Sequence, residues 1–370
     1  MTHALLPEGF HDRLPPLADA AARLERRVLD AAHAHGYERA DPPLAEFEEG
    51  LSQRLKASRA QDAVRFVDPV SQKSLAIRPD ITAQLGRIAA TRMAHHPRPV
   101  RLSYAGPVLK LRASQLSPAR EQHQVGCELI GLDTVAAAQE VVGVAVEALE
   151  AAGVAGLSID FTLPDLVATL AAGPLPIDAA LIATLRDRLD AKDAGGVAEI
   201  APGYLPLIEA AGPFDAAMDR LCAFDVGGAL TSRLKGLSAI VEGLNGRVTL
   251  TLDPTERHGF EYQTWLGFSI FAEGVRGEIG RGGSYTILHE DGAEEAAIGF
   301  SLYADSIVAA GLAPEERRRL FVPIGTDPAA AAKMRADGWV TVAALEAGDT
   351  PEAQLCTHFV ADGVPRALGD

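Results

Sequence analysis

RLSYAGPVLKLR (Arg101–Arg112) and REQHQVGCELIGLD (Arg120–Asp133) are the two stretches of sequence that decide the fold. Their short apolar runs predict three strands, Val100–Tyr104, Val108–Arg112 and His123–Ile130. Strands that follow one another this closely pair as antiparallel neighbours, because a parallel pair needs a long crossover connection. The stretches therefore predict an antiparallel sheet at the centre of the molecule.

Helical patterns lie on both sides of these strands. The stripe Leu17, Leu24, Val28 and Ala32 predicts a helix over 17–35, which Gly36 ends. Asp80 can cap a helix that runs to about residue 93, and Thr134 opens an alanine-rich helix that ends near residue 153. Further expected elements are strands at 64–69, 74–80 and 157–162, alternating strand patterns over 247–285, and a buried helix over 299–310. The sheet is therefore expected to carry helices on its faces, which makes an α+β fold.

The pattern changes twice along the chain. Residues from about 165 to 245 are almost wholly helical and interrupt the strands, which indicates a helical insertion. The last fifty residues alternate as strand 320–324, helix, strand 339–345, short helix and strand 357–361. We therefore expect a core at 1–315, including the insertion, and a small α/β segment at 316–370.

Composition and charge exclude several classes of protein. Among 370 residues, 48% are hydrophobic, and 50 acidic residues against 34 basic ones leave a net charge of −16. This charge repels phosphate, so we expect no binding to tRNA, DNA or a membrane surface. Three widely spaced cysteines (Cys127, Cys222 and Cys356) form no metal-binding or disulfide pattern. They favour a reducing compartment. The first residues have no signal-peptide pattern, so we expect a cytoplasmic protein.

Several local motifs are more specific than this periodicity. GYERADPPLAEFEE (Gly36–Glu49) resembles the first motif of class II aminoacyl-tRNA synthetases, with Pro43 where that motif's proline ends the dimer-interface strand. Together with the two stretches quoted above, later segments resemble the histidyl-tRNA synthetase version of this fold: AIRPDITAQLGRIAATRM (Ala76–Met93), HGFEYQTWLGFSIF (His258–Phe271), GRGGSY (Gly280–Tyr285) and AIGFSLYADSI (Ala297–Ile307). The resemblance covers about residues 5–310. It implies a class II synthetase-like antiparallel sheet flanked by helices.

The departures from this resemblance fall on the cations that would hold ATP. Lys110 stands at an arginine position of the second motif, and Ser306 at that of the third. His258 replaces the arginine of the histidine-specific segment. Each cation that no longer contacts the charge developing on the phosphates reduces the stabilisation of the transition state by about 2.7–4 kcal/mol. We therefore expect no adenylation activity.

The residues expected in the amino-acid pocket match the synthetase family better than the ATP-binding positions do. It implies that Asp80 and Thr82 hold an ammonium group and that Gln124 and Glu128 line the pocket. Tyr262 belongs to the same candidate set, Gln263 replaces a pocket tyrosine, and Lys110 or His258 is left to supply a cation. These side chains predict an acidic pocket for a small cationic amino acid, here histidine, with no cofactor and no metal.

Each of these residues also has a purely structural interpretation. Asp80 is a good helix cap in its own right. A buried Glu128 needs a partner, which is either a ligand or an internal arginine such as Arg120. The glycines of 277–283 are interpreted as hairpin-turn residues, because no preceding parallel strand or P-loop lysine accompanies them. The cluster of Lys110, Arg112 and Arg120 is either a vestigial phosphate site or the counter-charge of nearby glutamates.

A synthetase-like chain without the ATP-binding arginines resembles one known family more closely. RPDIT (78–82), SYAGPV (103–108) and QHQVGCELIG (122–131) are similar to the regulatory subunits of ATP phosphoribosyltransferase. This resemblance implies a non-catalytic homodimer that joins a short catalytic subunit in a larger hetero-oligomer. The complex carries out the first step of L-histidine biosynthesis under histidine feedback. The alternatives are a divergent histidyl-tRNA synthetase-like enzyme and an amino-acid ligase, both of which need the ATP contacts that are missing.

Overall fold

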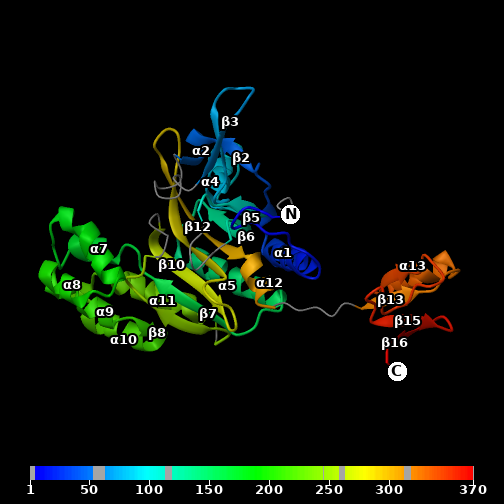
Figure 1. Cartoon of the computed structure of the whole chain (residues 1–370). Helices are drawn as coiled ribbons and strands as arrows, with labels where there is room; N and C mark the ends of the chain where they lie inside the picture. The colour runs from blue at the N-terminus through cyan, green and yellow to red at the C-terminus, as the bar shows by residue number, and fades with distance from the viewer. Residues whose placement is uncertain are drawn as a thin grey trace. The chain divides into compact units, whose positions relative to one another are not determined.

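The structure is a computed structural model that describes residues 5–52, 63–112, 119–244, 246–257, 263–311 and 318–369. The chain forms two compact units, Met1–Ala313 and Pro314–Asp370 (Figure 1). In the described ranges no helix is both long and apolar enough to cross a membrane.

A nine-stranded sheet forms the centre of the first unit. Its strands are β1 (Glu38–Arg39), β5 (Val100–Leu109), β6 (Glu121–Ile130), β7 (Leu157–Thr162), β8 (Gly212–Pro213), β9 (Thr249–Leu252), β10 (Gln263–Ala272), β11 (Gly280–Leu288) and β12 (Glu294–Tyr303). They lie in the order β1-β5-β6-β12-β11-β10-β7-β9-β8. The pairs β1–β5 and β7–β9 are parallel and the others antiparallel, so the sheet is mixed with an antiparallel centre.

One strand replaces the two that we expected at 100–104 and 108–112. β5 continues through Pro107, which faces His123 in the ladder with β6. The carbonyl of Pro107 accepts a hydrogen bond from Arg78 Nε at 2.8 Å, on the side away from β6. The N and C=O groups of one strand residue point to the same side of the strand. The nitrogen of Pro107 therefore also points away from β6, and its missing N–H removes no hydrogen bond between β5 and β6. A proline therefore does not break this strand.

The buried helix expected over 299–310 is also wrong. Residues up to Tyr303 belong to β12, which pairs with β6 on one side and β11 on the other, and only α12 (Ala304–Ala309) is helical. A short apolar run does not distinguish a buried helix from a central strand by its periodicity. Pairing on both sides satisfies the backbone of this run, and this decides in favour of the strand.

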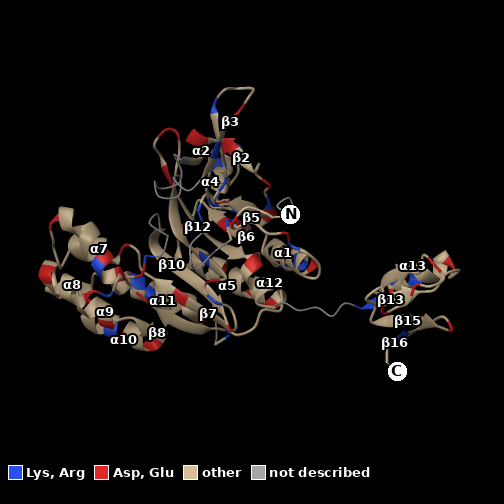
Figure 2. Ribbon diagram, in the orientation of Figure 1, with Lys and Arg blue, Asp and Glu red and all other residues tan. Residues whose placement is uncertain are grey.

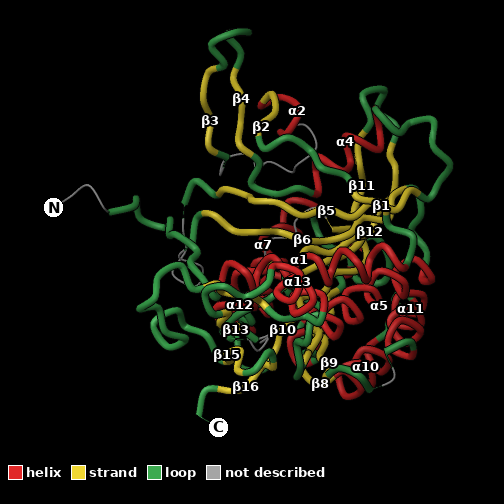
Figure 3. Tube along the Cα trace, turned by 90° about the vertical axis from the view of Figure 1, so that its right-hand side faces the viewer, coloured by secondary structure: helices red, strands yellow, loops and turns green. Residues whose placement is uncertain are grey.

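Helices cover both faces of the sheet. α1 (Leu17–Ala34) and α5 (Val135–Ala151) lie along one face (Figure 3) and share a core with Val125, Cys127 and Leu129 of β6. α4 (Thr82–Thr91) covers the other face, where its core includes Tyr104 and Ile130. Because side chains alternate along a strand, Glu128 and Ile130 point to the α4 face.

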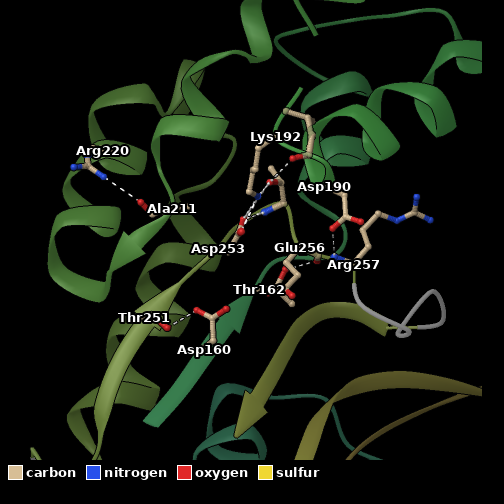
Figure 4. A network of polar contacts seen from close by, with 12 residues as sticks. Asp160, Thr162, Asp190, Lys192, Ala211, Arg220, Thr251, Asp253, Glu256 and Arg257 are labelled. Carbon is tan, nitrogen blue, oxygen red and sulfur yellow. Dashed lines mark hydrogen bonds and ion pairs between the residues drawn. The ribbon is translucent and has the colours of Figure 1, made fainter. Parts of the chain in front are cut away.

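The helical segment after β7 lies at the β8–β9 edge of this sheet. Its helices are α6 (Leu166–Ala171), η1 (Ala179–Leu181), α7 (Ile182–Asp190), α8 (Ala194–Ile200), η2 (Pro202–Tyr204), α9 (Pro206–Glu209), α10 (Phe214–Phe224), η3 (Val226–Gly228) and α11 (Thr231–Glu242). A polar network connects it to the residues after β9 (Figure 4). Lys192 Nζ donates to Asp253 Oδ1 at 2.6 Å, and Arg257 contacts Asp187 and Asp190 on α7.

A separate three-stranded sheet precedes α4. It contains β2 (Ala45–Phe47), β3 (Val64–Val67) and β4 (Ser74–Ile77) in the order β2-β4-β3, with α2 (Glu48–Ser52) beside it. All of its pairs are antiparallel. β3 and β4 confirm the expected strands with shorter bounds. The sheet is followed directly by the turn that carries Asp80.

The second unit is a small α/β arrangement. It contains β13 (Arg319–Val322), α13 (Pro328–Ala336), β14 (Val340–Ala343), β15 (His358–Ala361) and β16 (Val364–Ala367) in the order β14-β13-β15-β16. Leu320, Val322 and Met334 form its core. The short helix expected between β14 and β15 is absent from this described region, where the chain forms turns. Leu355 adopts a left-handed backbone with a φ of 52°, which ends the last turn.

Candidate functional site

Four of the expected pocket residues converge where α4 begins over β6. Gln124 Oε1 accepts a hydrogen bond from the N–H of Ile81 at 2.9 Å, and Gln124 Nε2 donates to Asp80 Oδ2 at 3.3 Å. Asp80 Oδ1 accepts from the N–H of Thr82 at 2.7 Å. Asp80 therefore belongs to a polar network with Gln124. It is not the cap of α4, because the cap position is Ile81 and no side chain caps this helix.

Glu128 is the buried centre of this network, with 1% of its surface exposed. Tyr285 Oη donates to Glu128 Oε2 at 2.7 Å and Tyr104 Oη to Oε1 at 3.4 Å, while the Thr82 side chain also bonds to the carboxyl group. Burial raises the pKa of Glu128 to about 8, against the opposing effect of these hydroxyl groups. The charge of Asp80 raises this pKa further. At neutral pH these surroundings therefore favour a protonated Glu128.

Arg120 is not the partner of Glu128. Its guanidinium lies over the ring of Phe10, 4.9 Å from the ring centre, and Arg120 Nε donates to the carbonyl of Lys110 at 3.2 Å. The partners of Glu128 are instead neutral hydroxyl groups. Arg120 therefore does not neutralise this carboxylate.

Glycines make the space that the carboxyl group occupies. Gly299 faces Glu128 in the β6–β12 ladder, and a Cβ atom there would lie 1.8 Å from Glu128 Oε2. Gly282 and Gly283 are strand residues of β11 that line the adjacent cavity, which corrects their interpretation as turn glycines. Gly277 does lie in the turn between β10 and β11, with a φ of 84°.

The cavity next to Glu128 measures about 20 Å³. One water needs about 10–15 Å³, so this space holds about one water. Gln263 and Arg281 contribute to its wall. Arg281 also forms an ion pair with Glu278. The sequence motifs did not indicate Arg281. Strand alternation could have indicated it, because Arg281 stands two residues before Gly283 and therefore lies on the same face of β11.

Tyr104, Tyr285 and Ser301 were also missed. Ser301 Oγ lies 2.7 Å from Tyr104 Oη and 2.6 Å from Gln124 Nε2, so it joins the two ends of the network. These residues come from three separate strands. Their alternation predicts which face of the sheet they lie on, but the strand order decides that they meet.

Lys110 lies apart from Glu128. Glu128 faces Leu102 of β5, and Leu109, the last residue of that strand, is about 23 Å further along. Lys110 Nζ lies 6.0 Å from the ring centre of Tyr303. Because Tyr303 faces Gln124 in the β6–β12 ladder, Lys110 is placed toward the Gln124 end of the network. His258 and Tyr262 lie outside the described residues.

Pro43 and Arg78 have different surroundings. Pro43 is exposed, and its carbonyl accepts from Gln84 Nε2 at 2.8 Å. Arg78 is buried and donates to the carbonyls of Pro42 and Pro107, both at 2.8 Å. Desolvation lowers the pKa of Arg78. The Arg78 turn is thus held by backbone carbonyls, which is a structural role.

The third-motif position carries no cation. Ser306 lies on α12, and its neighbour Asp305 forms an ion pair with Arg13 and accepts from the N–H of His123 at 2.6 Å. Acidic and basic residues are interspersed along the elements of both units (Figure 2). Within the described ranges, no three His, Cys, Asp or Glu side chains gather as metal ligands. The arrangement is suited to binding a small polar ligand.

Comparisons with known proteins show the family of this chain. The family model for histidyl-tRNA synthetase matches residues 9–307. A relative in Rhodospirillum centenum, named ATP phosphoribosyltransferase regulatory subunit, is 44% identical and is matched over 99% of this chain and 97% of its own length. The chain belongs to this family. A second member, from Paramagnetospirillum magneticum, is 42% identical over 98% of this chain and 97% of its own.

Solved structures show the fold that this family shares. An ATP phosphoribosyltransferase regulatory subunit/histidyl-tRNA synthetase from Bacillus halodurans superposes with a TM-score of 0.79 at 22% identity, covering 97% of each chain. Histidyl-tRNA synthetase from Nostoc has a TM-score of 0.78 at 17% identity, over 98% of this chain and 92% of its own. The class II synthetase-like α+β fold expected from the sequence is confirmed.

Proposed function

We propose that this chain is the non-catalytic regulatory subunit of ATP phosphoribosyltransferase. The observation that carries this proposal is the agreement of four relatives, 37–44% identical over nearly their full length, that bear this name. The partner is a short catalytic subunit, which joins ATP to phosphoribosyl pyrophosphate in the first step of L-histidine biosynthesis. Our chain contributes regulation to that complex.

We infer that histidine binds in the network around Glu128. Asp80 and Glu128 supply carboxyl groups, and Gln124 and Thr82 supply further polar contacts. Arg281 supports this proposal because it lines the cavity and can face the carboxylate of an amino acid. Histidine feedback would act through this pocket.

The chain is also proposed to lack adenylation activity. Ser306 leaves the third-motif position without a cation, and Asp305 beside it is engaged by Arg13. Lysine at 110 lacks the bidentate geometry of arginine. The alternative, a divergent histidyl-tRNA synthetase-like enzyme, requires histidine-dependent exchange of ATP and pyrophosphate. We expect none.

The proposal also covers the oligomeric state of the chain, its domain boundary and its place in the cell. Exposed Pro43 fits a homodimer contact, and the homodimer would form part of the larger hetero-oligomer. The boundary proposed near residue 315 separates this synthetase-like core from the C-terminal segment. All three cysteines are free thiols, which suits a reducing cytoplasm.

The test mixes the purified chain with the short catalytic subunit of the same organism and follows phosphoribosyl-ATP formation. We expect the chain to bind, to change the rate, and to make the rate sensitive to histidine. Glu128→Ala should weaken the histidine effect while the complex still forms. Glu242→Ala, on the exposed end of α11, is the matched control and should behave as the wild type. A chain that neither binds nor changes the rate contradicts the proposal, and pyrophosphate exchange then tests the synthetase alternative.

A further inference from the structure

Arg186, in the helical insertion, is a partly buried cation without a carboxylate of its own. It lies on α7 directly after Leu185, which belongs to the core of the first unit. The Nε atom of Arg186 is buried, and within the part of the chain that the structure describes no acceptor bonds to it. Arginines that pack against a core are normally paired, so this one needs a specific explanation.

The carboxylates of α7 bind another residue. Asp190 stands four residues after Arg186, the spacing at which a helical ion pair forms. Its Oδ1 atom instead accepts from the backbone N–H of Arg257 at 2.9 Å (Figure 4). Asp187 accepts from Nη1 of the same Arg257 at 2.6 Å. Arg257 therefore takes the acceptors that α7 offers, and the guanidinium group of Arg186 is left over.

A second guanidinium group increases the positive charge at this place. Burial lowers the pKa of Arg186, and the nearby charge of Arg257 lowers it further. Asp165 opposes this effect, but both of its Oδ atoms accept from Arg233 of α11. The Asp187 side chain is 72% exposed, so water screens its attraction to Arg257. Arg186 and Arg257 therefore repel each other unless an anion lies beside them.

This place is separate from the cavity beside Glu128. Asp165 follows β7, Arg186 lies on α7 and Arg257 follows β9, so three segments meet where the helical insertion joins the sheet. None of these three residues lines the Glu128 cavity. An inference about Arg186 therefore does not depend on the proposed histidine pocket.

We propose that Arg186 is the centre of a binding site for one phosphoryl group of a small molecule. A guanidinium group is planar and binds two phosphate oxygens through parallel N–H bonds. A phosphoryl dianion also matches the second positive charge, that of Arg257. The net charge of −16 opposes a ligand with many phosphates, such as a nucleic acid, so the site is expected to take a single phosphoryl group.

The test is a ³¹P NMR titration of inorganic phosphate with the full chain at about pH 8, where phosphate is a dianion, and at constant ionic strength. We expect saturable binding to the wild type. Arg186→Gln should weaken it by about 10- to 100-fold, the effect of removing hydrogen bonds from a charged group. Arg188→Gln is the matched control, because it removes the same charge from the same helix. Arg188 is 52% exposed and is paired with Asp193 at 2.7 Å, so this variant should bind phosphate as the wild type does.

Several results would overturn the inference. They are no saturable binding to the wild type, wild-type affinity in a folded Arg186→Gln variant, and an equal loss in Arg186→Gln and Arg188→Gln, which would reflect net charge alone. Acetate that displaces phosphate at equal concentration would assign the site to a carboxylate and overturn the phosphoryl group. If Arg186→Gln does not fold, Arg186→Lys keeps the charge and the alkyl stem. It should still weaken phosphate at least threefold, because lysine cannot form the bidentate contact, and an unchanged affinity overturns the inference.

Discussion

At the scale of single residues, the site is governed by burial and close approach. Glu128 lies among hydroxyl groups and beside Gly299, in a buried part of the sheet face that α4 covers. A carboxylate in such a place is costly to ionise. This has consequences for the pH dependence of folding and for which substitutions the site tolerates.

The first prediction concerns the pH dependence of stability. Burial raises the pKa of Glu128 to about 8, and its unfolded value is about 4.3. Between these values the folded state binds more protons, so the stability falls as pH rises, by at most about 1.4 kcal/mol per pH unit. Below about pH 4 the contribution is complete, and above about pH 8 it is lost. We expect urea unfolding at pH 5, 7 and 9 to show this slope in the wild type and its loss in Glu128→Gln.

Glu242→Gln, which changes an exposed side chain, should leave that slope unchanged. Parallel stability curves for the wild type and Glu128→Gln would show that Glu128 does not titrate with the folding equilibrium.

The second prediction concerns Gly299. A Cβ atom there would overlap Glu128 Oε2, so Gly299→Ala should destabilise the chain by about 1–3 kcal/mol. Adding Glu128→Ala should recover part of this loss, because the overlapping group is then removed. Gly143→Ala in α5 is the control, since a Cβ atom at Gly143 meets nothing within 4 Å. It should stabilise the helix by about 0.5–1 kcal/mol, as measured by chemical denaturation.

At the scale of elements, α1 and α5 begin where the sequence signals predict, whereas α12 and two strands do not. Thr134 caps α5 as expected, with its side chain accepting the N–H of Ala137 at 3.2 Å. The signals for β5 and β12 were misleading, because their pairing outweighed a local proline in one case and apolar periodicity in the other. Local chemistry therefore determines helix ends, while neighbours determine strand extent.

The third prediction tests this cap. Thr134→Ala removes the acceptor for the Ala137 N–H and should destabilise the chain by about 0.5–2 kcal/mol. Thr91→Ala is the control, because the Thr91 hydroxyl only donates to the Arg87 carbonyl within α4 on an exposed side. Guanidinium unfolding of both variants measures the difference. Equal stabilities for the two variants would assign no net capping energy to Thr134.

At the scale of the whole molecule, each unit has a hydrophobic core of its own. The core of the second unit is small, centred on Leu320, Val322 and Met334. A unit that buries less surface has a smaller free energy of unfolding, and this free energy falls less steeply with denaturant concentration. The two units are therefore not expected to unfold in a single cooperative transition.

The fourth prediction uses the two tryptophans of the chain. Trp265 lies on β10 of the first unit, and Trp339 packs against His358 in the second, with ring centres 4.6 Å apart. Trp265→Phe and Trp339→Phe variants therefore each leave one fluorescent reporter. We expect the Trp339 signal to change at a lower urea concentration than the Trp265 signal. Coincident transitions would mean that the units unfold together.

The sequence by itself determined the synthetase-like fold and the beginnings of α1 and α5, and its motifs predicted Asp80, Thr82, Gln124 and Glu128 as pocket residues. These features depend on local chemistry and on ordered motifs, which a sequence carries directly. Only the tertiary structure decided that Tyr104 and Tyr285 reach Glu128, that Arg281 lines the same cavity, and that Arg120 lies over Phe10 instead. The physical reason is that strand order and register join residues that are far apart in the chain. Alternation along one strand predicts a face but not a neighbour.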